Sequence, residues 1–212
     1  MRLIRHKKQH YPVSENLSQY LQRFGRYIEL PVHYNDLLQF NETMDVYDKY
    51  DNPTLWQTVI YPSSISAEIE EGLTKIYSQL LADGNSAIVP HLSVDRVDFC
   101  SYANTCPFRI RIINSYNDNY DHFYIKKADS SRIYGLELEG LLSPNRINYL
   151  VDNETLIEEH IIGIPGDSFI QNKILGESVN RVRLAKEFVK FNERCFVSLL
   201  GDMRAYNYII NV

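Results

Sequence analysis

Apolar side chains recur every three or four residues in two segments of the first part of the chain. In the segment 14–30 the apolar positions share one helical face, which predicts an amphipathic helix that ends before Pro31. The segment 64–81 repeats the pattern and predicts a second helix, which Ser64 or Ser66 caps. The Tyr-, Asn- and Asp-rich connection between them contains one apolar run with the length of a strand, 55–60.

The period of the pattern falls to two after the second helix. Residues 108–113 and 122–127 alternate apolar and polar side chains, and the polar segment 114–120 between them has the composition of a turn. The three segments therefore predict an antiparallel hairpin. A mixed alternation over 91–99 precedes it.

Helices and strands then follow each other to the end of the chain. We expect a short helix over 132–142, capped by Ser130 and Ser131, and a second hairpin between 146 and 161. A longer helical pattern follows at 181–195. The predicted fold class is α+β, with an antiparallel sheet.

Composition and charge narrow the function classes. The chain has 212 residues and a formal net charge of −5, which argues against a general binder of nucleic acid or of anionic membranes. No apolar run reaches the ~18 residues of a membrane span, and the basic N-terminus leads into no apolar signal segment. The spacing of the three cysteines, Cys100, Cys106 and Cys195, is not that of a zinc site. Reduced thiols and a cytoplasmic location are the expectation.

The last stretch of the chain carries the clearest candidate chemistry. Asp202 and Asn207 stand five residues apart in the pattern Gly-Asp-x-x-x-x-Asn, between a helical pattern and an apolar strand pattern. An aspartate here can accept a hydroxyl proton, and an asparagine can bind Mg²⁺ through its side-chain oxygen. Both residues are also common in turns, because their side chains bond to nearby backbone groups. Taken alone, the pair is therefore more often structural than catalytic.

The order of the predicted elements gives this motif a context. From residue 108 onwards the chain runs hairpin, helix, hairpin, break, helix, catalytic-type loop, strand. This order resembles the small lobe and the first part of the large lobe in the protein-kinase-like superfamily, especially its aminoglycoside-phosphotransferase-like branch. The resemblance covers about half of the chain. It implies ATP and Mg²⁺ as cofactors and an unknown hydroxyl group, on a small molecule or a protein, as the phosphate acceptor.

The resemblance also implies roles for particular residues. Lys126, at the end of a strand, is similar to the lysine that holds the nucleotide phosphates, and Asp202 to the catalytic base. An acidic residue of the next helix would orient the lysine, either Glu139 or, preferably, Glu137. The strand 156–163 resembles the hinge, where the backbone of Glu159 and Ile161 would contact the adenine edge.

Three features depart from that family pattern. Leu200 stands where the loop usually carries a histidine, and the segment 114–120 has no glycine to form a Gly-rich phosphate loop. No second metal-binding aspartate follows the last strand before Val212. From this we expect a phosphotransferase that is inactive as these 212 residues and whole only with a C-terminal continuation.

The expected organisation has three parts. Residues 1–90 would form a helical N-terminal extension, 91–170 a kinase-like small lobe with an antiparallel sheet, and 171–212 the start of the large lobe. The alternative is a non-catalytic kinase-like binding or scaffold module. A third interpretation is an unrelated α+β protein in which Asp202 and Asn207 are turn residues.

Overall fold

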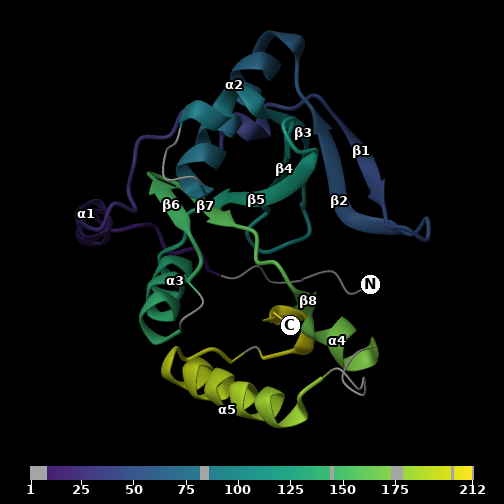
Figure 1. The fold of residues 1–212 in the computed structure, drawn as a ribbon. Coiled ribbons are helices and arrows are strands. Elements are labelled where there is room, and N and C mark those ends of the chain that lie inside the picture. The colour runs from purple at the N-terminus through teal and green to yellow at the C-terminus, as the bar shows by residue number, and fades with distance from the viewer. Residues whose placement is uncertain (1–8, 82–85, 144–145, 173–178, 202, 212) are drawn as a thin grey trace. The chain divides into compact units, whose positions relative to one another are not determined.

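The computed structural model describes residues 9–81, 86–143, 146–172, 179–201 and 203–211 (Figure 1). It divides into two compact units, which we describe separately. The sheet unit comprises residues 1–133 and 148–160, and the helical unit comprises residues 134–147 and 161–212. The expected α+β class is confirmed.

An antiparallel sheet of seven strands forms the framework of the sheet unit, in the order β1-β2-β3-β4-β5-β7-β6 (Figure 1). Strands that follow each other in sequence pair with each other, β2 and β3 across the connection that contains α2, except that β7, not β6, lies beside β5. The strands are β1 Glu42–Tyr47, β2 Pro53–Ile60, β3 Leu92–Phe99, β4 Phe108–Asn114, β5 Asn119–Lys127, β6 Tyr149–Asp152 and β7 Thr155–Glu159.

One face of this sheet is apolar and is covered by the long helix α2, Ser63–Leu81 (Figure 1). Its buried positions Ile69, Leu73, Ile76 and Leu80 recur at helical spacing, and the strands contribute every second side chain to the same core. The core side chains of the central strands are Phe108, Ile110 and Ile112 on β4 with Phe123 and Ile125 on β5. Because the strand pattern has period two, the opposite face of the sheet receives the polar half of each strand.

Short elements complete the sheet unit. Helix α1 (Glu15–Arg23) ends where Gly25 adopts a positive φ of 67°, so the helix expected to reach residue 30 is shorter than its apolar pattern. The 3₁₀ turns are η1 (Asp36–Leu38) and η2 (Ser86–His91).

Helix α3, Ser130–Leu142, follows β5 directly. Its cap is Asp129 rather than Ser130 or Ser131, because the Asp129 carboxylate accepts from the Ser131 amide at 2.9 Å and from the Ser131 hydroxyl. The other Asp129 oxygen accepts from the Tyr11 amide at 2.9 Å. The start of α3 is therefore tied to the N-terminal segment.

The helical unit contains two further helices and a small strand pair. They are β8 Ile164–Pro165, α4 Gly166–Asn172, α5 Arg181–Val197, the 3₁₀ turn η3 Ala205–Asn207 and β9 Ile209–Ile210, with β8 paired to β9. The rings of Phe191 on α5 and Tyr208 lie 5.2 Å apart. Gly166 is so close to Tyr208 that a Cβ on it would lie 2.1 Å from the ring.

Both predicted hairpins and the helices near 132–142 and 181–195 are present, but the expected organisation of the first ninety residues differs from the structure. Strands β1 and β2 extend the same sheet as β3 to β7, and α2 covers its core, so this region is not a separate helical extension. The apolar run 55–60 and the alternation 91–99 are both strands of that sheet. These segments became strands of one sheet because they pack against partners that are distant in sequence, and a local pattern does not contain that information.

Candidate functional site

A row of polar and aromatic side chains crosses the sheet on the face opposite α2. Directly paired positions link Thr58, Asp98, Arg109, Tyr124 and Glu158 across five adjacent strands. Directly opposite residues of antiparallel strands project from the same face. The sequence places titratable groups at these alternate positions, so the sheet aligns them.

Lys126 lies in a cluster at one end of this row. Its Nζ donates to Glu158 Oε2 at 2.8 Å, across the boundary between β5 and β7. Arg132, in the first turn of α3, donates Nε to Oε1 at 2.8 Å and Nη2 to Oε2 at 2.7 Å of the same carboxylate. Glu158 is only 3% exposed. One buried carboxylate thus holds two cations, and the Lys126–Arg132–Glu158 cluster keeps a net positive charge.

The charges of the cluster shift the pKa of each group. Burial opposes ionisation of Glu158, but the hydrogen bonds and charges of Arg132 and Lys126 outweigh it and lower its pKa from 4.5 to about 2. Burial lowers the pKa of Lys126, and the charge of Arg132 adds to that, against the opposing effect of Glu158. The two shifts therefore have different main causes: burial dominates for Lys126, whereas the two cationic partners outweigh burial for Glu158.

A second ion cluster lies further along the same row. Asp98, fully buried, accepts from Arg109 Nε at 3.1 Å and Nη2 at 2.7 Å, and from the Thr58 hydroxyl at 2.8 Å. The Arg109 guanidinium lies 4.5 Å from the centre of the Trp56 ring. This carboxylate is shielded from solvent and its partners are all within the sheet, so the cluster fixes β2, β3 and β4 to one another.

Two histidines lie beside this row. Tyr124 Oη and His160 Nδ1 are 3.1 Å apart, and the rings of His122 and His160 are 5.6 Å apart. Burial, followed by the charge of Arg109, lowers the pKa of His122 to about 4, and burial lowers that of His160. Both imidazoles are therefore neutral at physiological pH.

The structure pairs Lys126 with a different carboxylate from the two that the sequence suggested. Glu137 and Glu139 belong to the helical unit, where Glu139 lies 3.7 Å from Arg194 of α5. The carboxylate that contacts Lys126 is Glu158.

The two residues expected to form the hinge, Glu159 and Ile161, belong to different units. The amide of Glu159 donates to the Asn148 carbonyl at 3.0 Å, and its carboxylate accepts from the Asn148 amide at 2.8 Å, so that N–H is already engaged. Ile161 follows in the helical unit with its side chain 42% exposed.

The loop motif is described only in part. Asp202 lies outside the described residues, whereas Asn207 is the last residue of η3 and its amide donates to the Arg204 carbonyl at 2.8 Å. The oxygen of a carboxamide is a ligand that Mg²⁺ accepts, so the chemistry of Asn207 fits that ion. Within the described residues, no group of three or more His, Cys, Asp or Glu side chains is arranged to hold a metal.

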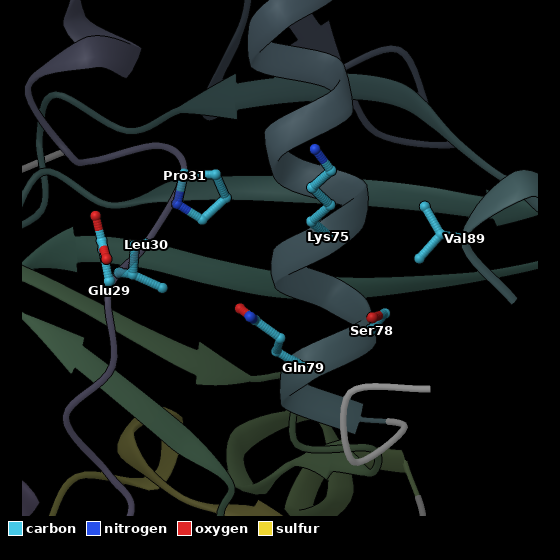
Figure 2. Close-up of a pocket in the computed structure, with 7 residues that line it drawn as sticks. All are labelled: Glu29, Leu30, Pro31, Lys75, Ser78, Gln79 and Val89. Atoms are coloured by element: carbon cyan, nitrogen blue, oxygen red, sulfur yellow. The ribbon is translucent and has the colours of Figure 1, made fainter. Parts of the chain in front are cut away.

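Each unit contains a surface hollow. Figure 2 shows the first, about 540 Å³, with Lys75 and Gln79 of α2 between the segment Glu29–Pro31 and Val89. The second, about 590 Å³, is in the helical unit and is lined by Phe196, Leu200 and other residues near the end of α5. Among the described residues that line them, none is one that the sequence singled out as catalytic or cofactor-binding.

Neither a family model, nor a curated protein, nor a solved structure matches this chain. Function therefore has to be argued from the site. No helix among the described residues has the length and apolar character needed to cross a bilayer.

Sequence reasoning identified Lys126 but missed its partner Glu158 and the second cation on that carboxylate, Arg132. Glu158 sits in the run Leu156-Ile157-Glu158-Glu159, where strand alternation puts it on the face opposite the buried Ile157. Alternation therefore indicated the face of the sheet on which Glu158 lies, but not the strand beside it. The pairing of β5 with β7 could not be read from the chain.

Proposed function

We propose that this chain belongs to an ATP- and Mg²⁺-dependent phosphotransferase of the kinase-like type that acts on a hydroxyl group. The observation that carries the proposal is Lys126, held on a central strand by a buried carboxylate with a second cation beside it. A fixed cation of this kind neutralises the charge of nucleotide phosphates, and positioning together with charge neutralisation supplies most of the catalysis in phosphoryl transfer.

The chain order around the lysine supports the same proposal. Strands β3, β4 and β5 form a meander, Lys126 lies near the end of its third strand, and α3 and the β6–β7 hairpin follow. Kinase-like small lobes also carry the lysine on their third strand. If β3, β4 and β5 correspond to the first three strands of such a lobe, the loop between the first two strands is 100–107, not 114–120 as the sequence suggested. It too has no glycine.

The structured turn in the helical unit supports the other half of the proposal. Asn207 follows α5 and precedes β9, which is the helix–loop–strand context that the motif requires. Bound Mg²⁺ would neutralise charge on the phosphates, with Asn207 as one of its ligands and Asp202 accepting the proton of the acceptor hydroxyl.

A thermal-shift titration with ATP and Mg²⁺ tests the proposal. Linkage predicts a stabilisation of ~2.7 kcal/mol at a hundredfold excess of nucleotide over Kd. The shift is expected to vanish in Lys126→Ala and to persist in Asp202→Asn. If ATP produces no shift in the wild-type chain at millimolar concentration, the proposal is wrong.

The second candidate is a non-catalytic kinase-like binding or scaffold module. The observation that favours it is Leu200, which is apolar and 59% exposed where the family's loop carries a bracing histidine. Nucleotide binding that depends on Lys126, with no phosphate transfer in any wild-type preparation, would select this candidate over the first.

A further inference from the structure

The carboxylate that holds Lys126 comes from a neighbouring strand and not from a helix. Lys126 pairs with Leu156 in the register of β5 and β7, and Glu158 lies two positions along, on the same face. Diagonal neighbours on paired strands are within reach of long side chains. The 2.8 Å contact is therefore built into the hydrogen-bonded ladder of the sheet.

The carboxylate is itself fixed by Arg132. The guanidinium binds both oxygens of Glu158, in the two-pronged geometry that orients a carboxylate most firmly. A cation in the first turn of a helix opposes the helix dipole, so local helix energetics do not explain Arg132. Its pairing with Glu158 does.

The cluster has more positive than negative charge, and its Lys126–Glu158 pair is poorly solvated, while Arg132 has 43% of its side chain exposed. Lys126 has only 18% of its side chain exposed, and Glu158 has 3%. Two cations that share one carboxylate leave an excess positive charge, which an anionic oxygen can balance. The lowered pKa of Lys126 agrees with this arrangement.

We propose that Glu158, with Arg132 behind it, is the residue that positions Lys126 for the phosphates of a nucleotide, in place of an acidic residue of α3. This inference rests on the proposed function. In protein kinases the position of a helix controls whether the lysine is paired. Here the pair forms within one sheet, so Lys126 is positioned before nucleotide binds and independently of any movement of the rest of α3.

The test compares the affinity of three variants for ATP and for adenosine by isothermal titration calorimetry. Glu158→Gln is expected to weaken ATP binding by ~10-fold or more, as for the loss of a hydrogen bond between charged groups, and to leave adenosine binding unchanged. Glu154→Gln is the matched control, because Glu154 lies in the same hairpin and faces Lys127 at 3.7 Å in an exposed pair. Its ATP affinity should equal that of the wild type.

Folding of each variant is checked by its circular dichroism spectrum and melting curve. Should Glu158→Gln fail to fold, Glu158→Asp keeps the negative charge but shortens the side chain by one carbon, which lengthens the 2.8 Å contact with Lys126, and the same selective loss of ATP affinity is expected. A folded Glu158 variant with wild-type ATP affinity would overturn the inference and give Glu158 a purely structural role.

The remaining outcomes separate this inference from the proposed function. Loss of ATP binding in Glu137→Gln with no loss in Glu158→Gln overturns the inference and leaves the phosphotransferase proposal standing. A wild-type chain that binds neither ATP nor ADP removes the proposed function, and the inference with it.

Discussion

The sheet unit and the helical unit use their apolar residues in opposite ways. In the sheet unit the apolar halves of six strands and of α2 close around one core, with Leu37, Leu73, Phe108, Ile110, Phe123 and Ile157 fully buried. In the described part of the helical unit the buried apolar side chains are Leu136, Phe169 and Cys195. Its exposed ones include Val182, Val189, Phe196, Val197, Leu199 and Leu200.

This difference teaches that a periodic apolar pattern predicts an element but not its burial. Helix α2 and helix α5 were both predicted from apolar residues at helical spacing. The pattern of α2 is covered by the sheet, whereas Phe196 at the end of α5 is 82% exposed. The stability of the sheet unit should therefore depend on packing far more than that of α5.

The largest effect is expected from a cavity in the sheet core. Ile110→Ala, on the central strand β4, should lower the free energy of unfolding by about 4 kcal/mol, since it removes a fully buried side chain from a closely packed site. Urea denaturation followed by the fluorescence of Trp56, which lies on β2, measures it. Val189→Ala on α5 is the control and should change the circular dichroism transition by no more than ~0.5 kcal/mol. Equal losses of unfolding free energy in the two variants would contradict the difference in burial between the two units.

Acid should weaken the sheet unit through Glu158. The pKa of Glu158 in the folded chain is about 2, below the ordinary value of 4.5. The stabilisation that ionised Glu158 contributes is therefore complete above pH 4.5 and is lost as the pH falls towards 2. The loss amounts to ~3 kcal/mol, and it should show as a falling Trp56 transition midpoint in urea. Glu158→Gln should abolish this part of the pH dependence. Glu187→Gln, which removes an exposed pair with Lys190 on α5, should leave the dependence intact.

A smaller effect is expected at Gly166, a closely packed position of the helical unit. In Gly166→Ala the new methyl group would lie 2.1 Å from the Tyr208 ring and 2.5 Å from the Ala205 carbonyl oxygen. Overpacking of this kind should cost ~1–3 kcal/mol in thermal unfolding followed by circular dichroism. Gly201→Ala meets nothing within 4 Å and should be close to neutral. If the two variants melt alike, the α4–β9 region is not packed as described.

The smallest change in stability is expected from the exposed apolar surface of α5. Phe196→Ser should alter the unfolding free energy by no more than ~0.5 kcal/mol, because the ring is 82% exposed. It should reduce binding of an apolar dye and self-association measured by light scattering. A loss of several kcal/mol would mean that this ring is buried in solution.

Much of the fold followed from local patterns. Alternation of apolar residues predicted the β4–β5 and β6–β7 hairpins, and helical spacing predicted α2, α3 and α5. The extent of α1 was overestimated because Gly25, and not Pro31, ends it. The cap of α3 was assigned to Ser130 and Ser131, whereas Asp129 one residue earlier provides it.

The candidate site was predictable only one residue at a time. Lys126 could be proposed from its place at the end of a strand, but its partner could not, because an acidic helix followed it in the chain. Glu158 reaches Lys126 since β7, and not β6, pairs with β5. Spatial order of strands is set by packing between distant segments, which the local pattern does not contain.

The sequence by itself indicated most of the helices and strands, although not β1 or α4, together with the two-sided character of the predicted strands and the positions of the chemically competent residues. Those properties depend on neighbours one to four places away along the chain. Only the tertiary structure decided that β1 and β2 belong to the same sheet, and that Glu158 and Arg132 surround Lys126. These contacts join residues 26 or more positions apart, so they exist only once the sheet has brought its strands together.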